Sequence, residues 1–416
     1  MQVWGENLKL ENITKEMKIS EKARIALFVG TLCSVSYFAV YIARNSLSAV
    51  TPQMLEGGFS EAYIGKISSV YFIVYAIGQL INGFIGEKIK ARYMISFGLI
   101  LAGICNFLFP IIANDQYGAV VVYGMTGFFL AMIYGPMTKV VAENVEPIYA
   151  PRCSIGYELA SFLGSPSAGI LAVFLPWQGV FFSGSAVLVL MGCVAFCVFL
   201  AFERKGIISY GQYSVAKQGK SKIKVLYKHQ IVKFCLIAIL TGVVRTSVVF
   251  WLPTYLTQYL GISSQSSAAI FSVVTFIMAT ITFITVFVYE RLKRNMDMTI
   301  LLMFSISLVA FVSVYFVKLT VLNVVLLVIA IMSSMGVSTM MWSRYCPGLR
   351  DTGMVSTVTG FLDFLSYMAA AVANLVFSNA VTSIGWRRLI LVWTALVAVG
   401  VIISLPYKRK NIVSEE

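Results

Sequence analysis

The chain has 416 residues, of which 59% are hydrophobic and only 12% are charged, and its formal net charge is +14. Soluble globular domains carry about twice that share of charged residues, so these values exclude an ordinary soluble protein. In such an apolar chain the excess of positive charge indicates contact with anionic lipid at a membrane surface, and we expect no nucleic-acid partner.

Twelve apolar runs follow one another along the chain, each long enough to cross a bilayer as a helix. The expected spans are 24–51, 62–85, 93–113, 117–142, 153–176, 179–202, 231–260, 265–289, 297–317, 321–345, 353–381 and 386–405. The first run is too long for a signal peptide and has no small-residue cleavage site. We therefore expect an all-α, multi-pass protein of a bacterial inner (plasma) membrane with twelve transmembrane helices.

Basic residues predict the orientation of these spans. If the N-terminus is inside, Lys66, Lys318, Arg387 and Arg388 lie outside and nearly all other loop lysines and arginines lie inside. Because cytoplasmic loops are enriched in lysine and arginine, both ends of the chain are expected in the cytoplasm. The single histidine, His229, falls in an inner loop, which excludes a histidine proton relay within the membrane.

A long polar stretch divides the chain at residues 203–229. It is rich in lysine and is expected to be a basic cytoplasmic linker. The predicted domains are therefore a six-helix bundle at 1–202 and a second six-helix bundle at 230–416. Two such halves in sequence are typical of transporters built from parallel repeats.

Each half contains an arginine inside its first apolar run, Arg44 and Arg245. A serine follows each arginine two residues later and a proline follows eight residues later, so the two stretches repeat after 201 residues (245 − 44). An arginine at the bilayer centre costs roughly 3 kcal/mol on insertion scales, which favours a functional role for both. We expect their guanidinium groups to share a water-accessible chamber between the halves, where planar donor forks would bind a tetrahedral oxyanion.

Other polar residues form stripes at helical spacing within the apolar runs. The candidate binding residues are Tyr37, Tyr41, Tyr75, Gln79, Lys139, Glu158, Asp363 and Tyr367, beside the two arginines. The alternative for the tyrosines is that they only pack helix against helix. Glu158 and Asp363 would either titrate or act as fixed counter-ions to a nearby arginine or lysine. Lys139 and Glu143 are four residues apart, which also suits an ion pair within one helix.

The loop after the second apolar run, GFIGEKIKARY at 83–93, places an acid before basic residues, and YERLKRN at 289–295 is a weaker second copy. We expect these residues to form a conformational lock between helices, although simple positive-inside charge would also explain them. The lock residues are Glu87, Lys88, Arg92, Glu290 and Arg291. The first loop resembles the cytoplasmic loop signature of the major facilitator superfamily, with Glu87 where that signature has aspartate.

Most of the chain resembles the organophosphate:phosphate antiporters of that superfamily. The resemblance rests on the segment from YIARNSLSAVTPQM to GFIGEK, on GPMTK at 135–139, on GMVSTVTGF at 353–361 and, most specifically, on RTSVVFWLPTYL at 245–256. It implies the major facilitator fold of two pseudo-symmetric six-helix bundles. It also implies import of glycerol phosphate, hexose phosphate or a related compound in exchange for inorganic phosphate, with Arg44 and Arg245 as the substrate-binding arginines.

Four positions depart from the family pattern. Gln79 stands where some members carry a lysine, and Ala160 stands where some carry a histidine. Glu158 lies near the second of these positions, and Asp363 falls where the glycerol phosphate carriers look uncharged. The expected pocket is therefore less cationic, and a monoanion, a carboxylate or a zwitterion would suit it as well as a phosphate.

Three functions follow from these observations. The first is an antiporter that works by alternating access and exchanges an organic phosphate for inorganic phosphate. The second is proton-coupled transport of a carboxylate, sugar or zwitterion through Glu158 or Asp363, because a buried carboxyl with a raised pKa can carry the proton. The third is a sensor that binds a sugar phosphate without transporting it.

An enzyme is not expected, because the sequence has no nucleophile–base arrangement and no phosphate-binding glycine loop. The seven cysteines lack metal-ligand spacing, so we expect no metal and no cofactor. The expected partners are a small anionic substrate and membrane lipid, and the expected state is a monomer.

Overall fold

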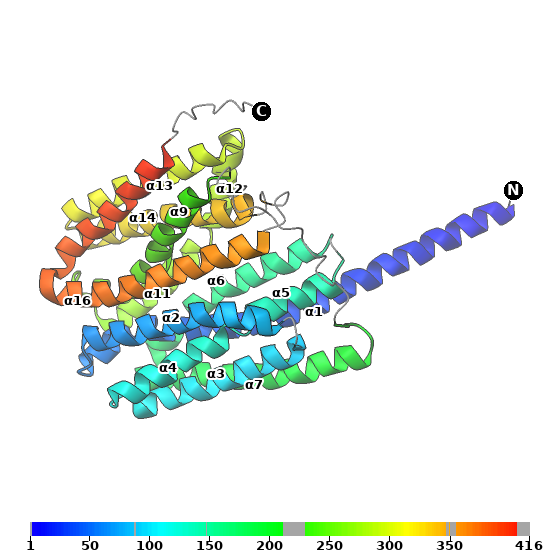
Figure 1. Cartoon of the computed structure of the whole chain (residues 1–416), viewed down its shortest axis with the longest axis horizontal. Helices are drawn as coiled ribbons and strands as arrows, with labels where there is room; N and C mark the ends of the chain where they lie inside the picture. The colour runs from blue at the N-terminus through cyan, green and yellow to red at the C-terminus, as the bar shows by residue number, and fades with distance from the viewer. Residues whose placement is uncertain are drawn as a thin grey trace, which may run out of the picture. The chain divides into compact units, whose positions relative to one another are not determined.

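The computed structural model is all-helical. It describes residues 2–86, 89–146, 148–210, 229–346, 349 and 355–405. The first half contains α1 (Gln2–Glu56), α2 (Glu61–Gly86), α3 (Ala91–Ile112), α4 (Gln116–Leu130), α5 (Tyr134–Asn144), α6 (Ala150–Phe174) and α7 (Trp177–Arg204) (Figure 1). The second half contains α9 (Ile231–Gly242), the π-helix η1 (Val243–Val248), α10 (Val249–Gln258), α11 (Ser264–Met278), α12 (Ile281–Arg291), α13 (Met296–Phe316), α14 (Thr320–Met340), the π-helix η2 (Met341–Tyr345) and α16 (Val355–Ser404).

Ten helical segments of the described part of the chain are long and apolar enough to cross a membrane. The apolar part of α6, Leu159–Phe174, is shorter than the others. Large apolar side chains also point outward from these helices: Phe174 is 79% exposed, Leu190 67% and Val309 66%. Helices that are apolar on their outer faces suit a lipid environment. The predicted count of twelve spans stays a prediction.

The last two predicted spans, 353–381 and 386–405, join in α16 at Gly385. This residue has a φ of 75° and a ψ of 166°, which is outside the helical region. Glycine adopts a positive φ without the steric cost that a Cβ atom would add. The chain therefore turns sharply there, between two apolar arms of one long helical element.

Several predicted spans are interrupted. The run 117–142 divides into α4 and α5, because Pro136 in the first turn of α5 has no N–H and its ring would clash with a preceding carbonyl. The run 265–289 divides into α11 and α12 at residues 279–280, where neither proline nor glycine lies. The run 231–260 contains η1, which Arg245 occupies.

The described residues form two compact units. The first consists of α1 to α7 together with residues 256–279, which include α11. The second consists of residues 229–255 and those from 280 onward. The division of the chain at the predicted linker 203–229 stays a prediction, and residues 211–228 lie outside the described part.

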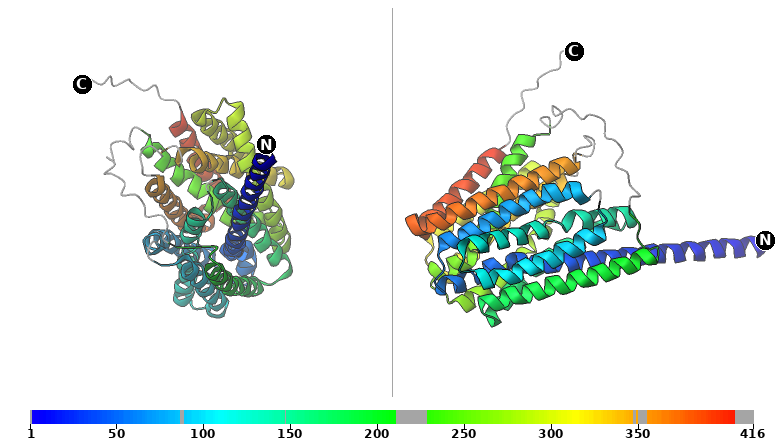
Figure 2. Two further views of the ribbon diagram at one scale, coloured as in Figure 1. Left: turned by 90° about the vertical axis from the view of Figure 1, so that its right-hand side faces the viewer. Right: turned by 60° about the horizontal axis from the view of Figure 1, so that its bottom comes forward.

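Each unit is built from closely packed helix pairs. In the first unit α1 packs on α6, α2 on α4 and α11 on α6, and α3 and α7 run side by side in Figures 1 and 2. The N-terminal end of α1 extends beyond the other helices of this unit (Figure 1). In the second unit α9 packs on α16, and α13 packs on both α14 and α16. In each half the helix that carries the arginine or directly precedes it, α1 or α9, therefore packs on a later helix of the same unit.

Candidate functional site

Arg44 lies on α1 in the first unit and is surrounded by aromatic rings. Its guanidinium carbon is 5.0 Å from the ring centre of Tyr75, 5.2 Å from that of Tyr41 and 5.7 Å from that of Phe72. Tyr41 comes from the preceding turn of α1, and the other two rings come from α2. Ring faces attract a guanidinium, so this cage stabilises the charged side chain at its half-buried position.

The ring cage continues into a larger tyrosine cluster of the first unit. Tyr37 meets Tyr41 edge-on at 5.0 Å and also contacts the ring of Tyr134 on α5. Tyr71 stacks on Tyr75 and lies 5.0 Å from the ring of Tyr123 on α4. The structure therefore brings four helices together at Arg44.

Gln79 is the polar end of this cluster. Its side-chain amide donates a hydrogen bond of 2.9 Å to the Tyr75 hydroxyl, one turn earlier on α2. Of the predicted binding residues, the structure thus brings together Tyr37, Tyr41, Arg44, Tyr75 and Gln79.

The close approach of α6 fixes the position of α1 beside Arg44. A Cβ atom at Gly164 would lie 2.4 Å from the Cβ atom of Tyr41, so only glycine permits this contact. Glu158 is on the same helix, but its side chain lies outside what the structure describes. Lys139 and Glu143 are on α5, half-buried and buried respectively.

Arg245 lies in the π-helix η1 of the second unit. Its guanidinium carbon is 5.8 Å from the ring centre of Tyr367 on α16. Wide π-turns are rare and occur often at functional sites. The sequence did not predict this turn, since no glycine or proline lies within residues 243–248.

The two ends of η1 are tied to α16. A Cβ atom at Gly242 would lie 2.5 Å from the backbone oxygen of Ser366, so the helices touch there. The Ser247 hydroxyl donates a hydrogen bond of 2.8 Å to the Ala370 carbonyl. Asp363 is half-buried on α16, one turn before Tyr367. Arg245, Tyr367 and Asp363 therefore belong to one helix pair.

Of the predicted lock residues, Arg92 makes the best-defined contact. Its guanidinium donates a hydrogen bond of 2.8 Å to a carboxylate oxygen of Glu203 at the end of α7, and both side chains are largely buried. Glu87 and Lys88 lie outside the described residues. Glu290 and Arg291 end α12, and the Arg291 guanidinium lies 5.1 Å from the ring of Phe287 on the same helix. The described contact of Arg92 therefore joins two helices of one unit.

The start of the predicted linker folds onto this ion pair. Burial and the nearby Glu203 carboxylate raise the pKa of the Tyr210 hydroxyl well above its usual value. The Ser209 N–H donates a hydrogen bond of 2.7 Å to the side chain of Asn144. Residues 205–210 therefore belong structurally to the first unit.

Sequence reasoning missed two of these partners. Glu203 lies at the end of the apolar run of α7, in the sequence FERK. An acid beside basic residues at the end of an apolar run was a signal for an ion-pair partner. Phe72 gave no signal, because an apolar side chain in an apolar run is ordinary. Within the described residues, no group of three or more His, Cys, Asp or Glu side chains could hold a metal ion.

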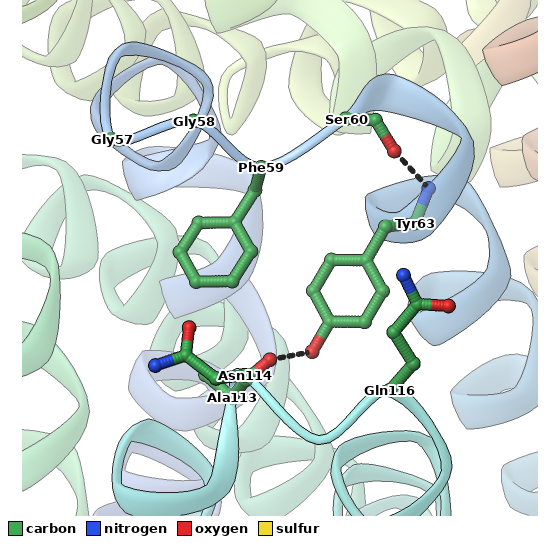
Figure 3. Close-up of a pocket in the computed structure, with 8 residues that line it drawn as sticks. All are labelled: Gly57, Gly58, Phe59, Ser60, Tyr63, Ala113, Asn114 and Gln116. Atoms are coloured by element: carbon green, nitrogen blue, oxygen red, sulfur yellow. Dashed lines mark hydrogen bonds between the residues drawn. The ribbon is translucent and has the colours of Figure 1, made fainter.

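The first unit also has a polar pocket at the end where α1 meets α2 and α3 meets α4 (Figure 3). Its cavity is about 250 Å³. The lining residues are Gly57, Gly58, Phe59, Ser60, Tyr63, Ala113, Asn114 and Gln116. All are neutral and none is a predicted binding residue, so this pocket offers no counter-charge to an anion.

The arrangement of helices matches known membrane transporters. A bacterial homologue of the human lysosomal transporter Spinster superposes with a TM-score of 0.73 at 12% identity, over 91% of this chain and 95% of that one. A D-xylose–proton symporter superposes with a TM-score of 0.68 at 13% identity, over 93% and 96%. A sequence model of the Major Facilitator Superfamily matches residues 33–373. The chain belongs to the major facilitator superfamily.

Curated relatives of the chain include a glycerol-3-phosphate transporter, a membrane sensor protein and a vesicular glutamate transporter. A glycerol-3-phosphate transporter of Bacillus subtilis is 22% identical over 59% of this chain and 60% of its own length. The membrane sensor protein UhpC of Escherichia coli is 23% identical over 55% of this chain and 56% of its own length. A vesicular glutamate transporter of Bos taurus is 24% identical over 37% of this chain and 29% of its own length. The chain thus aligns with little more than half the length of the first two relatives.

The predicted resemblance to the glycerol phosphate and hexose phosphate transporters is therefore confirmed, and the protein is a multi-pass integral membrane protein. Members of this superfamily are transporters and generally not enzymes. The roles of the individual arginines, tyrosines and acids stay predictions.

Proposed function

We propose that the protein is a secondary active transporter that exchanges an organic phosphate for inorganic phosphate by alternating access. The observation that carries the proposal is its homology to glycerol phosphate and hexose phosphate transporters. Arg44 and Arg245 each contribute to binding the anionic group, and one arginine per half links anion binding to movement of the halves. The proposal includes twelve transmembrane helices, cytoplasmic termini and a monomer.

The surroundings of Arg44 support this role. Three rings within 5.7 Å stabilise the guanidinium at a half-buried position within an apolar span. Tyr41, Tyr75 and Gln79 add neutral hydroxyl and amide groups to the same cluster. Such groups suit the hydroxyls of a sugar or glycerol moiety, while the guanidinium suits the phosphate.

Counterflow in phosphate-loaded proteoliposomes tests the proposal. We expect external glycerol phosphate or hexose phosphate to enter only when phosphate is inside. Because truncating a buried charged partner costs roughly 2–5 kcal/mol, Arg44→Ala and Arg245→Ala should each lower the rate about 30-fold or more. Arg387→Ala is the matched control, since this exposed arginine also lies over a tyrosine ring, that of Tyr315 at 4.8 Å. Absence of counterflow with every phosphate compound in the wild-type protein would overturn the proposal.

A second candidate is proton-coupled transport of an organic anion or zwitterion. Asp363 favours it, because this half-buried carboxyl lies one turn from the ring that packs on Arg245. In that case an uncoupler abolishes accumulation, and Asp363→Asn retains exchange but loses accumulation. Uptake that is indifferent to uncouplers would exclude this candidate.

A third candidate is a sugar-phosphate sensor, which the similarity to UhpC favours. It predicts that purified protein binds hexose phosphate, measured as a rise in melting temperature, without any counterflow. Binding together with counterflow would exclude a sensor that does not transport.

A further inference from the structure

An apolar groove lies on the second unit between α9, the start of η1 and the two arms of α16, which are orange and red in Figure 1. Its volume is about 450 Å³, and all eleven lining side chains are apolar. Both walls belong to apolar segments long enough to cross a membrane, Ile231–Gln258 and Val358–Ser404. Since an apolar cavity does not retain water, this groove is filled by hydrocarbon or by another apolar segment. We call it the α9–α16 groove.

The dimensions of the α9–α16 groove fit one extended acyl chain. On the first arm of α16 the lining residues run from Leu365 to Phe377, which is about 18 Å at a rise of 1.5 Å per residue. This length is close to half of a hydrocarbon core about 30 Å thick. A volume of about 450 Å³ over that length corresponds to a mean width of roughly 5 Å. Nonbonded carbon atoms approach to about 3.5–4.0 Å, so a methylene chain fits, whereas a helix about 10–12 Å across does not.

One end of the groove carries a positive charge. Arg388 lies four residues before Val392 and eight before Leu396, so these three residues share one face of the second arm of α16. Arg388 is exposed, and α16 contains no acidic residue after Asp363. Within the residues that the structure describes, Arg388 forms no ion pair. Its charge is therefore available to an anionic headgroup at the end of the groove.

The neighbouring arginine has a different environment. The Arg387 guanidinium carbon lies 4.8 Å from the ring centre of Tyr315 on α13. Successive residues of a helix point about 100° apart, so Arg388 is on the groove face of the arm and Arg387 is on the α13 face. This pair allows the same charge to be removed from two sides of one helix.

We propose that the α9–α16 groove binds a phospholipid, with one acyl chain in the groove and the phosphate of an anionic headgroup, such as phosphatidylglycerol, on Arg388. The planar donor fork of arginine matches phosphate oxygens. A headgroup that also carries an ammonium brings a like charge near Arg388 and binds more weakly. By the positive-inside pattern the site faces the outer leaflet. Val243, the first residue of η1, lines the groove, so the bound chain packs on the helix pair that positions Arg245.

Native mass spectrometry of the full-length protein, titrated in detergent with phosphatidylglycerol, tests the headgroup contact. We expect one molecule to bind with saturation before further, weaker binding. Arg388→Ala should weaken this first step about tenfold or more, because a hydrogen bond to a charged group is lost. Arg387→Ala is the matched control and should change it less than twofold. Equal weakening in both variants, or none in Arg388→Ala, would overturn the proposal.

Filling the groove tests the acyl chain. Ala369 is a half-buried lining residue, so Ala369→Phe places a ring in the groove and should abolish the first binding step. Ala395→Phe is the control, because Ala395 is exposed on the second arm and does not line the groove. Wild-type binding by Ala369→Phe would contradict the proposal. If that variant does not fold, phosphatidylglycerol with a photoreactive acyl chain should label the wild type within residues 365–377 and 392–396, and labelling spread evenly over all outer helices would contradict it instead.

A second copy of the chain is the competing occupant, because Ala369 and Ala373 are small residues one turn apart, as at packed helix pairs. The same spectra distinguish the two occupants. A monomer that carries one phospholipid supports the lipid site, whereas a dimer that Ala369→Phe dissociates would overturn it. None of these measurements uses phosphate transport, so the lipid site and the proposed exchange of phosphates stand or fall separately.

Discussion

Arg44 and Arg245 occupy equivalent positions of the repeat, but different features hold them. Arg44 lies on a regular α-helix with three rings within 5.7 Å of its guanidinium carbon. Arg245 lies on a π-helix with the ring of Tyr367 at 5.8 Å, and that π-helix is tied to α16 at both ends. The repeat therefore preserves the charge and its spacing, while side chains position one arginine and backbone geometry positions the other.

The largest effect is expected where each arginine-bearing helix touches its partner most closely. Gly164→Ala and Gly242→Ala would each place a Cβ atom within 2.5 Å of a neighbouring helix. Overpacking of this kind costs about 1–3 kcal/mol, so both variants should melt several degrees lower in detergent. Gly360→Ala is the control, because a Cβ atom there meets nothing within 4 Å. An unchanged melting temperature for either of the first two variants would contradict the close contact.

An effect of about the same size concerns the guanidinium groups themselves. Arg44→Lys and Arg245→Lys keep the charge but lose the planar pair of donors. Since a hydrogen bond to a charged group is worth roughly 1.5–3 kcal/mol, each variant should weaken phosphate binding about tenfold or more. The change in melting temperature with added phosphate measures this. Lysine variants with wild-type affinity would show that charge alone is sufficient.

A smaller effect should distinguish the aromatic surroundings of Arg44 from those of Arg245. Tyr367→Leu removes the ring that lies 5.8 Å from the Arg245 guanidinium, whereas Tyr41→Leu leaves Tyr75 and Phe72 beside Arg44. Because a desolvated cation–π contact is worth up to about 2 kcal/mol, we expect the first variant to lose more anion affinity than the second. Phosphate titrations of both variants test this order. Equal losses of anion affinity would mean that the rings of Tyr75 and Phe72 do not compensate for the missing ring of Tyr41.

The smallest effect is expected at the paired serines. The Ser247 hydroxyl bonds across to Ala370, whereas the equivalent Ser46 hydroxyl bonds to Ile42 on its own helix. Ser247→Ala should therefore cost about 1 kcal/mol of stability, as a lost cross-helix hydrogen bond does. Ser46→Ala should cost less, because its hydrogen bond lies within one turn of a single helix and joins no second helix. Denaturation of the two variants side by side measures the difference in stability. An equal loss of stability would mean that the hydrogen bond across to Ala370 adds nothing beyond one within a single helix.

Helical spacing within one element was readable from the sequence, and contacts between distant elements were not. The stripe of Tyr41 and Arg44 predicted a shared face, and the structure places Tyr41 over the Arg44 guanidinium. Glu203 lies 111 positions from its partner Arg92, so no periodicity connects them. The π-turn at Arg245 coincides with the hydrogen bond of Ser247 to another helix, a tertiary contact that no glycine or proline within residues 243–248 indicates.

The anchored start of the linker has a consequence for dividing the protein into two polypeptides. Ile208 is buried and the Ser209 amide is bonded to Asn144, so these residues complete the surface of the N-terminal unit. A chain ended after Arg204 would leave that surface uncovered and prone to aggregation, whereas a chain ended after Tyr210 keeps it. Fragments meant to reassemble in the membrane should therefore be cut after Tyr210 and not where the apolar helix stops.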